Sequence, residues 1–378
     1  MRPGAMLLMT ALLVLSCGGG SPSGTHPSAS TASSSSSPSV GPSSSPTAGP
    51  LTGAYGLILS AGTLQLIKPD ASIEATASVA SPSVRYCSAQ QDGVNSLPPV
   101  SASDDQVYFR DGDTKIRMVV PPSSAVDVTT VPGGPATISF FSVSPDDQRI
   151  AVLVEDLSGS TAIGIRLYVE DLHGGGHHAD IYTTSVPKGK NGTTLWPMGW
   201  HQGALVLAVV AACAFEPVGL QPTEWHVANA SSGARMATIR GTNCVLSAWP
   251  SPAGVGCENT QGVTTLYDWT GKVISVTGPG SQDAGSATGI SPAGQSIFFS
   301  TGGVGVPVPT TRIVQLGPGP YATVQGHAAC GWIDEDHLLA PDAVIQFPAE
   351  TAGNVQVTAN ASSIAASGQC AGRFPGGL

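Results

Sequence analysis

Short runs of alternating apolar and polar residues, separated by tight polar turns, recur along most of the chain. The clearest example is SVSPDDQRIAVLVED at 142–156, in which the turn SPDD at 144–147 separates a short apolar run from the alternating residues 150–154. Proline restricts φ and aspartate tolerates turn geometry. The stretch therefore predicts a strand, a tight turn and a second strand.

The same hairpin plan returns elsewhere in the sequence. Close relatives of the 142–156 stretch lie at 101–112, 289–300 and 332–341, and looser ones lie at 199–208 and 248–257. Turn residues recur about every eight to twelve positions, and no long stretch has the 3.6-residue period of a helix. The pattern predicts an all-β repeat protein.

The spacing between turns predicts the architecture. The interval is 42 residues from Asp105 to Asp147, 40 from Gly254 to Gly294 and 42 from Gly294 to Asp336. Repeats of about 40–50 residues with four short strands each are typical of propeller blades. The sequence predicts six such blades, at 94–131, 135–187, 193–240, 242–278, 284–325 and 327–360.

Two segments remain outside these six blades. Residues 55–79 predict three strands with no innermost strand before them, and residues 361–378 predict one strand with nothing after it. Together they complete a seventh blade, which removes exposed sheet edges from the ring. The predicted fold is an all-β, seven-bladed β-propeller closed by N- and C-terminal strands.

The turn residues resemble those of the WD-repeat-like and TolB-like propellers of bacterial envelope proteins. Blades of those proteins carry a Ser-Pro-Asp-Gly turn before an apolar strand, and SPDD at 144–147 and SPAG at 291–294 are the closest matches here. The resemblance extends over residues 52–378, although the combined Gly-His and Trp-Asp signature of typical WD repeats is missing, since no Trp-Asp dipeptide occurs. It implies a scaffold of the kind that often binds proteins or peptides.

The first 17 residues have the pattern of an export signal. Arg2 precedes an apolar run at 6–15 that is too short to span a bilayer. The run ends in VLSC at 14–17, which resembles the lipobox of bacterial lipoproteins, where the cysteine is acylated and becomes the new N-terminus. We therefore expect lipidation of Cys17, with about 0.8 kcal/mol of membrane affinity per buried methylene. The alternative is an ordinary secretory signal in which Cys17 is incidental.

Residues 18–50 consist almost entirely of Gly, Ser, Pro, Thr and Ala. Such a composition cannot bury enough apolar surface to offset chain entropy, so we expect a disordered linker. The predicted organisation is a lipoprotein signal peptide at 1–17, this linker at 18–50 and the propeller at 51–378. We expect the protein on the extracytoplasmic face of the cell envelope, anchored to the membrane by lipid.

Six further cysteines follow Cys17, and an even number in an exported protein predicts disulfides. They are Cys87, Cys213, Cys244, Cys257, Cys330 and Cys370. Cys244 and Cys257 fall on the first two predicted strands of one blade, and Cys330 and Cys370 open the innermost strands of adjoining blades. These four are the disulfide candidates. Cys87 and Cys213 lie far apart around the predicted ring, which leaves open whether all six are bridged.

Other candidate chemistry is sparse. His173, His177 and His178 flank three glycines in a predicted outer loop, where a metal site and a solvated turn are the two interpretations. The Asp-Gly-Asp sequence at 111–113 predicts a hairpin turn rather than a calcium loop. The carboxylate pairs at 155–156 and 170–171 are expected to be solvated strand ends.

Three tryptophans share one place in the repeat, just before the hairpin turn. Trp200, Trp249 and Trp332 are therefore expected to pack between blades, with a ligand-stacking platform as the alternative.

The motif content favours binding over catalysis. Gly-x-Ser-x-Gly, a phosphate-binding Gly loop and His-Glu-x-x-His do not occur in the sequence. The net charge is −10 and the few basic residues are scattered, which argues against a nucleic-acid partner. We expect a scaffold for a protein, peptide or glycan ligand, with no catalytic residue, metal or cofactor. The alternative is a cell-envelope enzyme, a hydrolase or lyase, with its site at the propeller channel.

Overall fold

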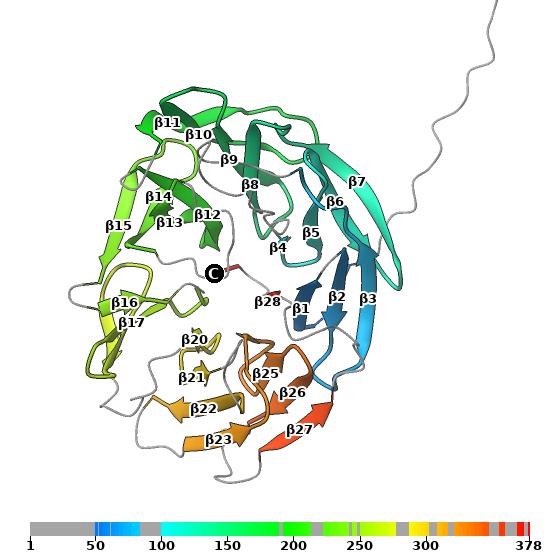
Figure 1. Cartoon of the computed structure of the whole chain (residues 1–378), viewed down its shortest axis with the longest axis vertical. Helices are drawn as coiled ribbons and strands as arrows, with labels where there is room; N and C mark the ends of the chain where they lie inside the picture. The colour runs from blue at the N-terminus through cyan, green and yellow to red at the C-terminus, as the bar shows by residue number, and fades with distance from the viewer. Residues whose placement is uncertain are drawn as a thin grey trace, which may run out of the picture. The chain divides into compact units, whose positions relative to one another are not determined.

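A computed structural model of the chain describes residues 50–51, 53–60, 62–83, 100–188, 192–212, 222–241, 244–247, 250–276, 287–301, 308–316, 321–347, 355–359, 369–373 and 377–378. The described residues form seven four-stranded antiparallel sheets arranged as blades in a ring, and they contain no helix (Figure 1). This confirms the predicted seven-bladed propeller.

The first three blades follow one another along the chain. Blade 1 contains β4 (Val100–Ala102), β5 (Val107–Asp111), β6 (Lys115–Val120) and β7 (Ser124–Thr130). Blade 2 contains β8 (Thr137–Val143), β9 (Arg149–Asp156), β10 (Ala162–Asp171) and β11 (Ala179–Pro187). Blade 3 contains β12 (Thr193–His201), β13 (Ala204–Ala211), β14 (Glu224–Asn229) and β15 (Arg235–Arg240).

The next three blades continue in the same order. Blade 4 contains β16 (Cys244–Leu246), β17 (Val255–Asn259), β18 (Thr264–Tyr267) and β19 (Val273–Val276). Blade 5 contains β20 (Ala287–Ile290), β21 (Ser296–Thr301), β22 (Thr310–Gln315) and β23 (Tyr321–Gln325). Blade 6 contains β24 (Gly331–Trp332), β25 (His337–Ala340), β26 (Ala343–Gln346) and β27 (Gln356–Ala359).

Blade 7 combines strands from distant parts of the sequence. It contains β28 (Gln369–Arg373), β1 (Tyr55–Ser60), β2 (Thr63–Ile67) and β3 (Ile73–Ser78), in that order across the sheet. The innermost strand β28 runs antiparallel to β1 and also contacts β24 of blade 6. On the other side, β3 contacts β6 and β7 of blade 1. The predicted closure of the ring by the two terminal strands is confirmed.

Packing between blades explains why the inner strands are apolar on both faces. In β9, Ile150 and Val152 belong to a cluster shared with blade 1, whereas Ala151 and Leu153 belong to a cluster shared with blade 3. Each fully buried aliphatic side chain of this kind contributes about 1.5–3 kcal/mol. The outermost strand β11 alternates exposed and half-buried positions instead.

The hairpin turns have the local chemistry that their sequence predicts. In blade 2, the Ser144 amide donates to the Arg149 carbonyl at 2.9 Å and the Asp147 amide donates to the Ser144 carbonyl at 3.0 Å. Asp147 has φ of 57° and Gly294, at the same place in the blade 5 turn, has φ of 71°. This left-handed conformation favours glycine, and aspartate is among the few other residues that adopt it readily.

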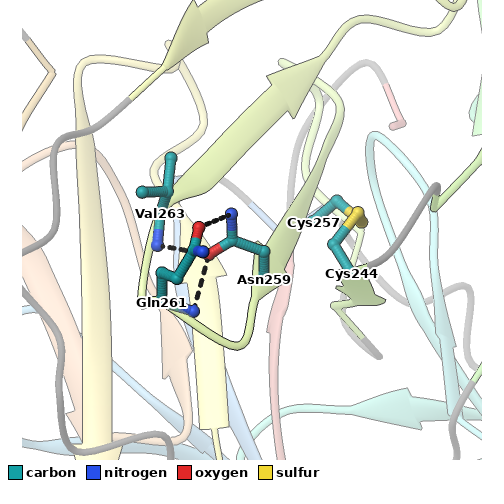
Figure 2. The surroundings of a disulfide bond; sticks show 5 residues. All are labelled: Cys244, Cys257, Asn259, Gln261 and Val263. Carbon is teal, nitrogen blue, oxygen red and sulfur yellow. Dashed lines mark hydrogen bonds between the residues drawn. A yellow bond between two sulfur atoms is a disulfide. The ribbon is translucent and has the colours of Figure 1, made fainter.

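Both predicted disulfide pairs are present. Cys244 joins Cys257 across the first hairpin of blade 4, with the Cα atoms 5.5 Å apart (Figure 2). Cys330 joins Cys370, with the Cα atoms 5.4 Å apart. The second bond ties the start of blade 6 to β28, the strand that closes the ring.

Figure 2 also shows how the turn after β17 is built beside the first of these disulfides. The Asn259 side-chain oxygen accepts from the amides of Gln261 and Val263, at 2.9 and 3.0 Å. This side chain therefore holds the turn that leads into β18.

Several of the predictions lie outside the described residues, namely Cys17, Cys87, Cys213 and Trp249. Among the residues that the structure does describe, no helix has the length and hydrophobicity needed to cross a membrane.

Candidate functional site

One face of the ring carries the turns between the innermost and second strands of blades 1 to 6. We call these turns the hairpin face; they comprise residues 103–106, 144–148, 202–203, 251–254, 291–295 and 333–336. Turns at equivalent places in successive blades project from the same side of a propeller. Main-chain and side-chain hydrogen bonds between neighbouring turns confirm that they lie together.

The turns of blades 4, 5 and 6 are linked in series. The Ser251 hydroxyl donates to the Ser291 carbonyl at 3.0 Å, and the Ser291 hydroxyl donates to Glu335 at 2.6 Å. The other Glu335 oxygen accepts from the Ala293 amide at 2.7 Å. Glu335 therefore fixes the blade 5 turn from the neighbouring blade.

A second set of contacts links blades 1 and 2. The Asp104 amide donates to the Pro145 carbonyl at 3.0 Å, and the Tyr108 hydroxyl donates to Asp147 at 2.8 Å. Burial raises the pKa of Asp147, and the charges of Asp105 and Asp104 add to this, although hydrogen bonds from Ser103 and Tyr108 oppose the shift. Burial likewise raises the pKa of Tyr108, so it remains a hydrogen-bond donor at neutral pH.

Two tryptophans pack between blades as the repeat predicts. Trp200 Nε1 donates to the Ser142 carbonyl of blade 2 at 3.3 Å, and Trp332 Nε1 donates to the Gly289 carbonyl of blade 5 at 3.0 Å. Both side chains are buried, with 1% and 2% of their surface exposed, so neither forms a ligand-stacking platform.

The hairpin face is acidic over part of the ring. Turns of blades 1, 2 and 6 carry seven carboxylates, whereas the turns of blades 3, 4 and 5 carry none. The seven are Asp104, Asp105, Asp146, Asp147, Asp334, Glu335 and Asp336. A ligand that approaches this arc meets negative charge, which favours cationic side chains on the ligand.

The histidine loop between β10 and β11 does not gather its histidines around one point. His177 Nδ1 lies 2.8 Å from Asp171 and His178 Nδ1 lies 2.8 Å from Glu170, while His173 is exposed. Within the described ranges, no group of three His, Cys, Asp or Glu side chains is arranged to hold a metal ion. The contacts agree with the solvated-turn interpretation.

The expectation of two solvated carboxylate pairs is wrong for Glu155. Its neighbour Asp156 is exposed and accepts from the Ser158 amide, but Glu155 has none of its surface exposed. It lies between Ile138 and Ile165 on the face of blade 2 that packs on blade 3, and neither carboxyl oxygen has a hydrogen-bond partner among the described residues.

Burial between blades 2 and 3 raises the pKa of Glu155. Burial disfavours the charged form and raises the pKa of the carboxyl well above its usual range. Burial therefore shifts Glu155 towards the uncharged form. Its place in the alternation of β9, on the same face as Ala151 and Leu153, is the signal that the sequence carried for its burial.

The Asp-Gly-Asp sequence forms the predicted hairpin turn and has a second role. Asp111 pairs with Lys115 where β5 meets β6, and Gly112 has φ of 65°. The carboxylates of Asp111 and Asp113 accept from the amides of residues 80 and 83, at 2.6 and 2.8 Å. They therefore hold the chain that leaves blade 7 against blade 1.

Comparison with known proteins shows similarity of fold alone. No protein-family model and no curated protein matches this chain. A solved structure of the C-terminal WD40 domain of Sif2 has 11% identity and a TM-score of 0.39, over 69% of this chain and 72% of that one. An oligogalacturonate lyase in complex with manganese has 11% identity and a TM-score of 0.41, over 70% and 76%.

A third similar structure is prolyl oligopeptidase B from Galerina marginata, with 10% identity and a TM-score of 0.35. The match covers 59% of this chain and 33% of that one. The similar structures thus include a WD40 domain, a lyase and an oligopeptidase, and similarity of fold alone does not assign a function.

Proposed function

We propose that this protein is a lipid-anchored scaffold on the extracytoplasmic face of the cell envelope, which binds a protein or peptide ligand at its hairpin face. The observation that carries the proposal is the linkage between turns. Glu335 of blade 6 holds the blade 5 turn, and Tyr108 of blade 1 holds the blade 2 turn through Asp147, so these loops form a rigid surface. A surface that needs little reordering loses little entropy when a ligand binds.

Two features support the proposed location. Disulfides persist in oxidising compartments, and two lie within the ring. The VLSC sequence at 14–17 and the Ser/Pro-rich segment at 18–50 have the order expected of a signal, an acylated cysteine and a tether.

The enzyme alternative would draw on Glu155, because perturbed carboxyl groups are common in active sites. A catalytic residue has to touch its substrate, and Glu155 has no exposed surface. Glu155 therefore lends no support to the enzyme alternative.

Two measurements test the proposal. Replacing Cys17 with Ser should move the protein from the detergent phase to the aqueous phase in a phase-partition assay, and an unchanged partition would contradict lipid anchoring.

A photoreactive amino acid at exposed Ala293, on the hairpin face, should give a discrete cross-linked product in intact cells. The matched control places it at exposed Ser160, in the turn between β9 and β10 on the other face. Equal cross-linking from both positions would contradict binding at the hairpin face.

A further inference from the structure

The last two described residues of the chain, Gly377 and Leu378, lie against the inner edge of β12. Among the described strands, β12 is the first of its sheet and pairs only with β13 along its length. At the end of β12, His201 and Gly377 form an antiparallel bridge, and the Leu378 amide donates to the Trp200 carbonyl at 2.5 Å. His201 Nδ1 donates to the main-chain oxygen of Leu378. Figure 1 shows the C-terminal end of the chain inside the ring.

Two glycines shape this contact. A Cβ atom on Gly199 would lie 2.3 Å from Leu378 Cδ1 and 2.7 Å from Cγ, so the leucine side chain occupies the space that Gly199 leaves. Gly377 has φ of 81°, and a Cβ there would lie 2.5 Å from the Trp200 oxygen and 2.8 Å from Pro145 Cγ. The site therefore accepts glycine followed by a branched apolar residue, and Leu378 packs against the core shared by blades 2, 3 and 4.

The residues that receive the segment are held in place independently of it. Trp200 is buried, its indole nitrogen donates to Ser142 of blade 2, and the Arg149 guanidinium lies 4.9 Å above its ring centroid. Pro145 belongs to the blade 2 turn, whose hydrogen bonds are described above. A preformed strand edge next to an apolar space is the arrangement by which sheets bind extended peptides.

We propose that the inner edge of β12, comprising Pro145, Gly199, Trp200 and His201, is a peptide-binding site for extended Gly-Leu sequences. In this structure it is occupied in cis by Gly377–Leu378. A segment of the same chain has an effective concentration of about millimolar, so it excludes a partner peptide until it leaves. The inference rests on the proposed binding function and specifies a class of ligand for it.

A labelled peptide tests the site directly. The probe is fluorescein-labelled Phe-Pro-Gly-Gly-Leu, the sequence of residues 374–378. A variant that ends at Gly376 should bind it saturably, at least tenfold more tightly than the intact chain does. The control peptide Phe-Pro-Gly-Ala-Leu should not bind, because its alanine Cβ meets the Trp200 carbonyl. Equal binding of the two peptides, or no binding by a shortened variant that melts cooperatively, would overturn the proposal.

A substitution in the full chain provides a second test that does not depend on the shortened variant. Gly199→Ala should displace Leu378, since the new methyl group meets only that side chain at close range. The Leu378 amide hydrogen, which donates to Trp200, should then exchange with solvent at least threefold faster than in the wild type, and an unchanged rate would overturn the proposed contact. If the labelled peptide does not bind the shortened variant but the cross-link from Ala293 still forms, this site alone is refuted. If the peptide binds but no discrete cross-link forms from Ala293, the hairpin-face function alone is refuted.

Discussion

The Tyr108 hydroxyl on β5 of blade 1 donates a 2.8 Å hydrogen bond to the Asp147 carboxylate in the hairpin turn of blade 2. The two residues lie 39 positions apart in the sequence, and Tyr108 is almost fully buried. Asp147 stands where blade 5 has Gly294, in the left-handed conformation that favours glycine. The contact explains why an aspartate is used there.

We expect Tyr108→Phe to lower the free energy of unfolding by about 1.5–3 kcal/mol, the usual value for a hydrogen bond to a charged group. Asp147→Gly should also destabilise the wild type, because it leaves the buried hydroxyl without its acceptor. In the Tyr108→Phe background the same substitution should cost less than in the wild type, since the Tyr108 bond is already gone and relief of backbone strain offsets the loss of the Ser103 bond. Urea unfolding of the four proteins measures this, and additive effects would contradict it.

Glu155 should make stability depend on pH. Its pKa is raised in the folded state, so its contribution to stability is fully present below the unfolded pKa of about 4.3 and is lost as pH rises towards the folded pKa. Glu155→Gln cannot ionise, and it should raise the melting temperature by at least about 2 °C near pH 8. The gain should vanish near pH 4.

The matched control for this prediction is Asp156→Asn, at the exposed neighbour of Glu155. Its pKa is lowered, mainly by hydrogen bonds from Ser158, so its substitution should not stabilise the protein as pH rises. A Glu155→Gln gain that is the same at both pH values would contradict a raised pKa of the Glu155 carboxyl in the folded state.

The two disulfides should contribute unequally. Loop-closure entropy predicts about 3 kcal/mol for the Cys244–Cys257 bond, with a sequence separation of 13, and about 4 kcal/mol for Cys330–Cys370, with a separation of 40. The second bond also holds β28 in the ring. Replacing Cys330 and Cys370 with Ser should therefore lower the melting temperature more than replacing Cys244 and Cys257. The reverse order would contradict a role of the bond in closure.

Removing the residues after Asn360 should expose the inner edge of β1 and the apolar contacts that β28 makes with blade 6. Exposed strand edges promote association between molecules, so we expect aggregation or a large loss of thermal stability. Light scattering during a thermal melt would detect this. The control is the variant that ends at Gly376, which retains β28 and should remain monodisperse.

Much of the fold was predictable because its determinants are local. The SPDD turn at 144–147 and its relatives divide the chain into blades through turn chemistry and a period of two, both visible in a few consecutive residues. The pairing of Cys330 with Cys370 followed once β28 was assigned as the innermost strand of blade 7. The use of Trp200 and Trp332 between blades followed from their shared place in the repeat.

The sequence by itself determined the strands, the turns, the blade count and the two disulfide pairs. The tertiary structure alone decided which charged groups are buried and which distant segments meet. Alternation places Glu155 on one face of β9, but only the packing of blade 3 removes that face from water. Leu378 fits beside Gly199 because closure of the ring brings the chain's last described residues to β12. A local pattern assigns a side chain to one face of a strand, but the neighbours that cover this face lie far away in sequence, and the pattern does not identify them.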